Sequence, residues 1–350
     1  MGVFDQLDAE YETVSFHHDP ASGLRCIIAV YSTALGPALG GTRFWPFESE
    51  EAALRDVLRL AKAMAYKASA AGLNLGGGKA VVIGDPRKVK TADLLRAYGR
   101  AVDRLGGAYI TTADVGTTSA DMDVISGATK FVTGTTNGSG DPSPVTSYGV
   151  WHGLKAVAEV IWGDASLAGR HVAVQGVGKV GAGVVRHLAQ EGARLTIADI
   201  DPETVSALAT EVGADVVAPD EILGVPCDIV SPCALGAVVN DSTLPAFNCR
   251  AIAGAANNQL ERPEHGAMLA EAGVLYAPDY VINAGGLINV EDELHGYDPD
   301  RAHAKAAAIG ARLHEVFGRA KTEGIPPAVA ADRIAGDRIR AASAAREHSG

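Results

Sequence analysis

The feature that most constrains the fold is the segment HVAVQGVGKVGAGVVRHLAQEGARLTIADID, residues 171–201. Gly176, Gly178 and Gly181 form the pattern G-x-G-x-x-G directly after an apolar run and at the start of a helix-like stretch. A second apolar run ends at Asp199. A strand, a helix and a second strand completed within about thirty residues form a βαβ unit whose glycines let a pyrophosphate approach the helix N-terminus. The segment predicts a dinucleotide-binding fold.

The acid that ends this unit indicates which dinucleotide binds. A carboxylate at that place accepts hydrogen bonds from the ribose hydroxyls and repels a 2′-phosphate. No arginine follows Asp199, because the next residues are Ile200, Asp201 and Pro202. An incidental tight turn with an unrelated acid is the alternative, which the spacing disfavours. We therefore expect NAD rather than NADP, bound by Gly176, Val177, Gly178, Lys179, Val180, Gly181 and Asp199.

The length of the chain indicates two domains. Its 350 residues exceed the size, about 250–300 residues, at which a single core stops growing. Turn formers and small polar residues fill GTTNGSGDPSPVTS (134–147), which is typical of a linker. We expect an α/β protein of two domains separated by a cleft, the second a Rossmann-type doubly wound parallel sheet. The expected domains are residues 1–140, residues 141–325 with the NAD site, and a C-terminal helical segment, 326–350, that packs back on the first domain.

Composition excludes several classes of partner. The formal net charge of −12 and the spread of acidic residues argue against nucleic acid or an anionic membrane. No apolar run approaches the ~18 residues of a membrane span. The cysteines show no C-x-x-C pair and no histidine at metal-ligand spacing, so we expect reduced thiols, no metal and a cytoplasmic protein. They are Cys26, Cys227, Cys233 and Cys249.

The first half of the chain contains a second glycine run, GLNLGGGKAVVIG (72–84). A glycine-rich turn before Lys79 suggests phosphate binding, but the run lacks the GxxxxGK[ST] spacing and the second half holds the better nucleotide site. A helix is expected from the capping Ser49 to about Gly72, with Lys67 in its last turn. The stretch GPALGG (36–41) is expected to break the preceding strand, LRCIIAVYST.

Lys79 and an aspartate form a candidate catalytic pair. YITTA (109–113) is expected to be a strand that delivers Asp114 to its end, and if it neighbours the strand at 80–83, the two side chains face the same place. A lysine that acts as a base near neutral pH needs a lowered pKa, which desolvation or a nearby cation provides. The alternatives are a surface salt bridge, and a solvated helix-end lysine at Lys67. Spacing alone leaves these open.

Motifs along nearly the whole chain carry a family resemblance. They are LGPALGGTR (35–43), MAYKASAAGLNLGGGKAVVIGDP (64–86), YITTADVGTTSADMD (109–123), QGVGKVG (175–181), SPCALGA (231–237), AGAANNQL (253–260) and LYAPDYVINAGGLINVEDEL (275–294). In these motifs the chain resembles the glutamate/leucine/phenylalanine/valine dehydrogenase family, and within it the bacterial leucine and valine dehydrogenases.

The resemblance implies roles for individual residues. Lys67 would bind the substrate α-carboxylate, Lys79 would activate water for attack on an iminium carbon, and Asp114 would exchange protons with the amino group. Contacts to the substrate backbone would come from Gly40 and Gly41, and contacts around the nicotinamide from Asn257 and Asn283. A buried, turn-forming asparagine is the alternative for the last two.

The implied reaction is the NAD-dependent oxidation of an amino acid to a 2-oxo acid and ammonia. The resemblance further implies that the first domain binds substrate, carries out catalysis and mediates oligomerisation, and that the protein is a homo-oligomer.

Four positions correspond to the side-chain pocket of family members, and their residues indicate which amino acid is the substrate. Leu39 stands where glutamate-specific relatives have a lysine, which favours an apolar side chain. Thr112 and Leu287 are bulkier than the residues that leucine-specific relatives usually have at these positions. Val290 is the remaining pocket position. Together they favour valine or isoleucine over leucine, although backbone shifts could absorb one or two methyl groups.

Other functions remain as alternatives. A phenylalanine dehydrogenase of the same family is one. A 2-hydroxy-acid dehydrogenase would need a histidine base beside a carboxylate-binding arginine, and neither occurs in a matching motif. A non-catalytic NAD-binding regulator would leave Lys67, Lys79 and Asp114 unexplained.

Overall fold

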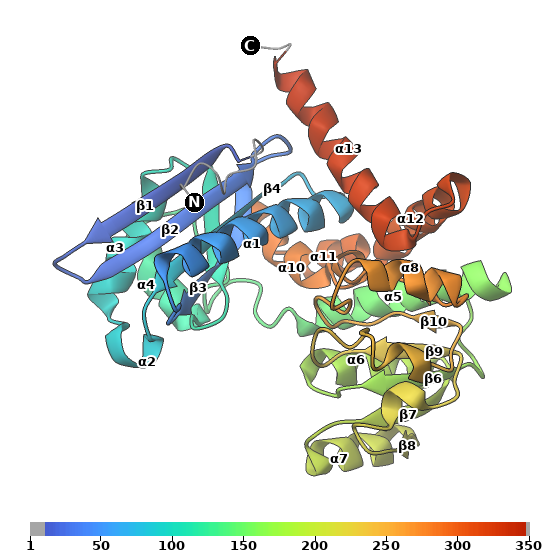
Figure 1. The fold of residues 1–350 in the computed structure, drawn as a ribbon. Coiled ribbons are helices and arrows are strands. Elements are labelled where there is room, and N and C mark those ends of the chain that lie inside the picture. Colours follow the sequence, from blue (N-terminus) through green and yellow to red (C-terminus); the bar gives the residue numbers. More distant parts are fainter. Residues whose placement is uncertain (1–10, 348–350) are drawn as a thin grey trace. The chain divides into compact units, whose positions relative to one another are not determined.

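The computed structural model describes residues 11–347, which divide into two compact units (Figure 1). The first unit comprises the described residues up to Gly140, the short segment Glu293–Tyr297, and the described residues from Ala335 onward. The second unit comprises Asp141–Asp292 and Asp298–Ile334. No helix within residues 11–347 is long and apolar enough to span a membrane.

The first unit is built on a mixed sheet with strand order β1-β2-β4-β3-β5. The strand β1 pairs antiparallel with β2, and β2 pairs antiparallel with β4. The strand β3 lies between β4 and β5 and is parallel to both. The bounds are β1 Thr13–Asp19, β2 Leu24–Ser32, β3 Ala38–Trp45, β4 Gly76–Ile83 and β5 Tyr109–Ala113.

Helices cover both faces of this sheet (Figure 1). Alternate residues of β2 face opposite sides, as the two-residue period of a strand requires. Ile27 and Ala29 pack in a core with α1, whereas Ile28 and Val30 pack in a second core with α3 and α4. The helices are α1 Glu50–Ala70, α2 Pro86–Val89, α3 Ala92–Asp103 and α4 Ser119–Ser126. The side chain of Ser49 caps α1 by accepting from a backbone N–H, as the sequence predicts.

One prediction for this sheet is incomplete, and the condition attached to another is not met. The stretch 36–41 does not only break a strand, because Ala38 already begins β3. The strands at 80–83 and 109–113 are not neighbours, because β3 lies between β4 and β5. Glycines hid β3 in the sequence, since they are typical of turns and weaken strand propensity.

The glycine run at 76–78 is part of a strand rather than a turn, since β4 begins at Gly76. A Cβ at Gly77 would lie 2.0 Å from the backbone nitrogen of Ala65 in α1. A Cβ at Gly78 would lie 2.7 Å from the ring of Tyr109. The glycines therefore allow a helix and an aromatic ring to pack directly on the strand backbone.

The second unit is built on an all-parallel sheet with strand order β11-β10-β9-β6-β7-β8. This order and direction confirm the prediction of a Rossmann-type doubly wound sheet. The strands are β6 His171–Gln175, β7 Arg194–Ala198, β8 Asp215–Val216, β9 Ile229–Pro232, β10 Ala251–Ile252 and β11 Leu275–Tyr276. The last two strands are short, and the stretch after β11 turns into the short helix α9, Asp279–Ile282.

The other helices of the second unit include the one that the glycine motif opens, α6 Lys179–Gln190. The remaining bounds are α5 Ser143–Trp162, α7 Pro202–Val212, α8 Glu264–Glu271, α10 Gly285–Asp292, α11 Pro299–Ala307 and α12 Ile309–Glu323.

The last helix, α13, spans Pro327–Glu347, and its residues from Ala335 onward belong to the first unit. There the carbonyl of Ala335 accepts a hydrogen bond of 2.9 Å from the hydroxyl of Ser69, and Arg338 donates to the carbonyl of Leu73 at 2.7 Å. These contacts attach the end of the chain to α1 and the loop that follows it.

Candidate active site

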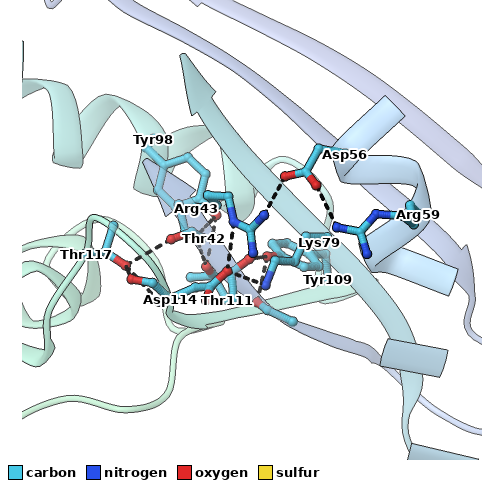
Figure 2. A network of polar contacts seen from close by, with 12 residues as sticks. Thr42, Arg43, Asp56, Arg59, Lys79, Tyr98, Tyr109, Thr111, Asp114 and Thr117 are labelled. Carbon is cyan, nitrogen blue, oxygen red and sulfur yellow. Dashed lines mark hydrogen bonds and ion pairs between the residues drawn. The ribbon is translucent and has the colours of Figure 1, made fainter. Parts of the chain in front are cut away.

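The structure brings Lys79 and Asp114 together in the first unit (Figure 2). Lys79 extends from β4, and Asp114 follows the end of β5. The Nζ atom of Lys79 lies 2.6 Å from Oδ2 of Asp114, and the lysine side chain is 7% exposed. A buried ammonium beside a carboxylate is a far less common arrangement than the surface salt bridge considered above.

Gly41 explains how the pair meets across the intervening strand. On β3, Leu39 pairs with Gly77 and Thr42 pairs with Ala80, so the same register puts Gly41 opposite Lys79. A Cβ at Gly41 would lie 2.7 Å from Cβ of Asp114 and 3.3 Å from Nζ of Lys79. The missing side chain leaves the space through which the lysine crosses β3.

The surroundings shift the proton affinity of both groups. Burial lowers the pKa of Lys79, because desolvation disfavours the charged ammonium, and the nearby carboxylate of Asp114 opposes this effect. Burial alone would raise the pKa of Asp114, but the positive charge of Lys79 outweighs it and holds that pKa below its ordinary value. Lys79 therefore loses its proton more readily than a lysine in water, while Asp114 stays ionised.

A cluster of hydroxyl groups supports the backbone beneath the pair (Figure 2). The hydroxyl of Thr42 lies 2.5 Å from that of Tyr98 and 2.6 Å from that of Thr111. The hydroxyl of Tyr109 donates to the carbonyl of Gly40 at 2.7 Å. Buried hydroxyls that satisfy one another in this way fix the positions of their strands.

The loop that carries Asp114 has its own support. The backbone N–H of Asp114 donates to the hydroxyl of Thr117 at 2.9 Å, and that hydroxyl lies 2.9 Å from the carbonyl of Thr42. Sequence reasoning missed these supporting residues, because a buried threonine or tyrosine in a strand looks like any other core residue until the strand order is known. The missed residues are Thr42, Tyr98, Tyr109, Thr111 and Thr117.

The other residues expected to contact substrate lie in both units. In the first unit, Lys67 is half-buried in the last turn of α1, Leu39 is buried in β3, and Thr112 is half-buried in β5 opposite Gly41. In the second unit, Leu287 is buried and Val290 is half-buried on α10.

The glycine loop of the second unit has the geometry of a pyrophosphate cradle. Gly176 has a φ of +88°, and a Cβ there would lie 2.5 Å from Cβ of Ala234. A Cβ at Gly181 would lie 2.0 Å from the carbonyl oxygen of Gly176. Gly178 is the N-cap of α6, and a Cβ there would meet nothing within 4 Å. The first and third glycines thus serve the turn and the helix packing, and the second leaves open space at a helix N-terminus.

The other residues expected at the cofactor surround this loop. Oδ2 of Asp199 accepts a hydrogen bond of 2.7 Å from the backbone N–H of Val177, so the carboxylate also fixes the loop. Lys179 lies in the first turn of α6, and its Nζ atom is 2.9 Å from Oδ2 of Asp141. Val180, the next residue, is half-buried. The residues present fit a dinucleotide cofactor.

The two asparagines are connected to each other. The side-chain amide of Asn283 is buried and donates to Oδ1 of Asn257 at 2.8 Å and to the carbonyl of Ala255 at 3.1 Å. Asn257 is exposed. Asn283 therefore holds the loop that presents Asn257. Within residues 11–347, no group of three or more histidine, cysteine, aspartate or glutamate side chains could hold a metal ion.

Comparisons with known proteins agree with this geometry. Residues 11–131 match the family model described as Glu/Leu/Phe/Val dehydrogenase, dimerisation domain, and residues 138–205 and 197–345 match the model for Glutamate/Leucine/Phenylalanine/Valine dehydrogenase. The chain is 54% identical to a leucine dehydrogenase of Geobacillus stearothermophilus, with 99% of this chain and 95% of the relative covered. It is 51% identical to a valine dehydrogenase of Streptomyces albus, with 98% and 96% covered.

A solved structure is similar over the same extent. The L-tryptophan dehydrogenase of Nostoc punctiforme superposes with a TM-score of 0.90 at 46% identity, covering 97% of this chain and 98% of that one. The matches extend over both units, and the predicted resemblance is confirmed. The chain belongs to the glutamate/leucine/phenylalanine/valine dehydrogenase family and is an amino-acid dehydrogenase, an oxidoreductase that uses a nicotinamide cofactor.

Proposed function

We propose that this enzyme oxidises an apolar, branched-chain L-amino acid to its 2-oxo acid, with release of ammonia and reduction of NAD, and that it catalyses the reverse amination. The observation that carries the proposal is the buried contact of 2.6 Å between Lys79 and Asp114 beside the side-chain-free Gly41. This arrangement suits a lysine base that activates water beside a carboxylate that exchanges protons with an amine. The relatives named leucine and valine dehydrogenase support the substrate class.

The proposed mechanism assigns a task to each residue of the site. Bound NAD supplies the acceptor for the hydride that leaves the substrate Cα. Lys67 binds the substrate α-carboxylate, and the backbone at Gly40 and Gly41 contacts the same end of the substrate. Neutral Lys79 takes a proton from water as the water attacks the iminium carbon. Asp114 exchanges protons with the amino group and the departing ammonia.

The second unit supports NAD over NADP. The carboxylate of Asp199 is fixed beside the loop by the N–H of Val177, where it would repel a 2′-phosphate. Two uncovered apolar side chains, Ile200 at 90% exposure and Leu235 at 78%, follow β7 and β9, the strands on either side of β6. They offer the apolar surface that an adenosine moiety needs at the carboxyl edge of such a sheet. Asn257, held by Asn283, would lie near the nicotinamide.

The side-chain pocket determines the substrate. We assign contacts with the substrate side chain to Leu39, Thr112, Leu287 and Val290, none of which carries a charge, so we expect the enzyme to reject the side chain of glutamate. The extra bulk of Thr112 and Leu287 favours valine or isoleucine over leucine. A hydrophobic pocket discriminates one methylene by only about 1–3 kcal/mol, so activity on neighbouring amino acids is expected.

We assign substrate binding, catalysis and oligomerisation to the first unit and NAD binding to the second. A homo-oligomer is supported by the description of the matched family model as a dimerisation domain. The proposed location is the cytoplasm, and the proposed small-molecule partners are the amino acid and the 2-oxo acid.

The test is an assay of NADH formation at mildly alkaline pH. The substrates are L-valine, L-leucine, L-isoleucine, L-phenylalanine, L-tryptophan and L-glutamate, together with the matching 2-hydroxy acids. Turnover should be fastest with the branched-chain amino acids and should require NAD rather than NADP. Turnover of hydroxy acids alone, or of L-glutamate in preference to the apolar amino acids, would contradict the proposal.

A further inference from the structure

The catalytic pair has a third charged neighbour. Arg43 lies on β3, two residues after Gly41, and its Nε is 3.6 Å from Oδ2 of Asp114 (Figure 2). This is the oxygen that Nζ of Lys79 contacts at 2.6 Å. The other end of the guanidinium is anchored, because Nη1 donates to Oδ2 of Asp56 on α1 at 2.7 Å.

The arginine is held in place but has an unused donor. Among the described residues, the buried Nε–H of Arg43 makes no hydrogen bond. A buried N–H without an acceptor is costly and is uncommon in native structures. Oδ2 of Asp114 lies 3.6 Å from this Nε, and a movement of a few tenths of an ångström would bring that oxygen within hydrogen-bonding distance.

The proposed reaction gives this donor a task. Lys79 must be neutral to take a proton from water, and at that moment Asp114 loses the cation that holds its charge. A buried carboxylate without a charged partner tends to take up a proton. Arginine stays protonated throughout the accessible pH range, so it can keep such a carboxylate ionised when a lysine cannot.

We propose that Arg43, anchored by Asp56, is a positioning residue that keeps Asp114 ionised and oriented while Lys79 is neutral. This inference rests on the proposed function and deepens it. During turnover, Nε of Arg43 replaces Nζ of Lys79 as the main partner of Oδ2 of Asp114. The positive charge of Arg43 also disfavours the protonated form of Lys79 and so promotes the neutral base.

A purely structural ion pair between β3 and α1 is the competing explanation. It predicts a change in stability without a change in how activity depends on pH. The charged groups that bear on Lys79 are Asp114 after β5, Arg43 on β3 and Asp56 on α1. Arg59 on α1 donates to the same Asp56 at 2.9 Å but is 59% exposed, which makes it a matched control.

The experiment compares pH profiles of kcat for oxidative deamination. In R43Q, the loss of a positive charge raises the pKa of Lys79, so the rising limb of the profile should move to higher pH by about 1 unit. The value of kcat on the plateau should fall roughly 10²-fold, because Asp114 is no longer held in place. R59Q should keep the wild-type profile.

The conservative variant R43K separates charge from geometry. It keeps the positive charge, so its rising limb should stay at the wild-type pH, while its kcat should fall about tenfold because the planar Nε–H donor is lost. If R43Q does not fold, this variant carries the test. A rising limb of R43K that moves upward, or a wild-type kcat, would then overturn the inference.

The result for the wild-type enzyme keeps the two proposals apart. A wild-type enzyme that turns over no amino acid with NAD would overturn the proposed function and this inference with it. An active wild type together with an R43Q profile whose limb does not move would overturn the inference alone.

Discussion

The chain uses two glycine runs for opposite purposes. At Gly178, in the loop before α6, an added Cβ would enter open space at a helix N-terminus. At Gly77 and Gly78, in β4, an added Cβ would meet the protein itself, at Ala65 on one side and Tyr109 on the other. Empty space beside a glycine is available to a ligand, whereas occupied space indicates internal packing.

This difference explains why a glycine run followed by lysine is not a phosphate site here. The glycines of β4 let α1 pack against one face of the strand and Tyr109 against the other, and Lys79 is buried on the face that α1 covers. Gly41 then opens the path by which the lysine reaches Asp114. The glycine run in β4 therefore shapes the surroundings of a base, and the glycine run in the loop before α6 shapes the surroundings of a cofactor.

Replacing Lys79 should have a greater effect than any other substitution considered, and it should affect catalysis without affecting cofactor binding. Lys79→Ala should lower kcat by about 10³-fold or more, because the base is removed from a buried site. The affinity for NAD, measured by fluorescence titration, should stay within about twofold of wild type, because the loop before α6 is untouched. An active Lys79→Ala enzyme would contradict the assignment of the base.

A substitution in each run tests the packing argument. Gly77→Ala should destabilise the protein by about 3 kcal/mol, because the new methyl group collides with the backbone of α1. Gly178→Ala should leave stability almost unchanged and weaken NAD binding about tenfold, or about 1.4 kcal/mol. Urea unfolding and NAD titration of both variants measure these effects. Equal losses of stability would remove the distinction between the two runs.

Gly41→Ala sharpens the role of the third glycine. The added Cβ would crowd Asp114 and Nζ of Lys79, so kcat should fall roughly 10²-fold through misplacement of the pair. Binding of NAD serves as the control and should not change. A variant with wild-type kcat would show that the lysine does not need the space above β3.

The smallest effect concerns the cofactor preference. In Asp199→Asn, the side-chain oxygen can still accept from the N–H of Val177, so the loop is kept while the charge is lost. The ratio of kcat/KM for NAD to that for NADP should fall about tenfold, since the repulsion of a 2′-phosphate is removed. An unchanged ratio would mean that the charge of Asp199 does not determine the preference.

The sequence was more informative about the second unit than about the first. The Rossmann-type unit follows a fixed local pattern, so its glycines and the strand ending near Asp199 could be read within one segment. The first unit depends on contacts that are distant in sequence. The sequence gives only a weak signal for its edge strand β1, TVSFHHD, because Val14 and Phe16 are the only apolar residues in it and their alternation with polar residues stops at His17.

The candidate site also depends on contacts between residues that are distant in sequence. The sequence brings Lys79 and Asp114 together only on the condition that their strands are neighbours, and the two side chains meet although β3 lies between those strands. The reason is Gly41, which no spacing rule indicates. Arg43 and Asp56 lie on a strand and a helix, and only the packing of α1 on the sheet brings them together. Side chains that support a site through tertiary contacts leave no local signal.

We expect the packing of α1 on the glycines of β4 to lower the pKa of Lys79 by burying its ammonium group. The most direct measurement is the pH dependence of acetylation of Lys79 by acetic anhydride, resolved by mass spectrometry of the peptide that contains it. Only the neutral amine reacts, and burial lowers the pKa of this group, so half-maximal labelling should occur clearly below the ordinary lysine value of 10.5. Half-maximal labelling at or above 10.5 would contradict the account.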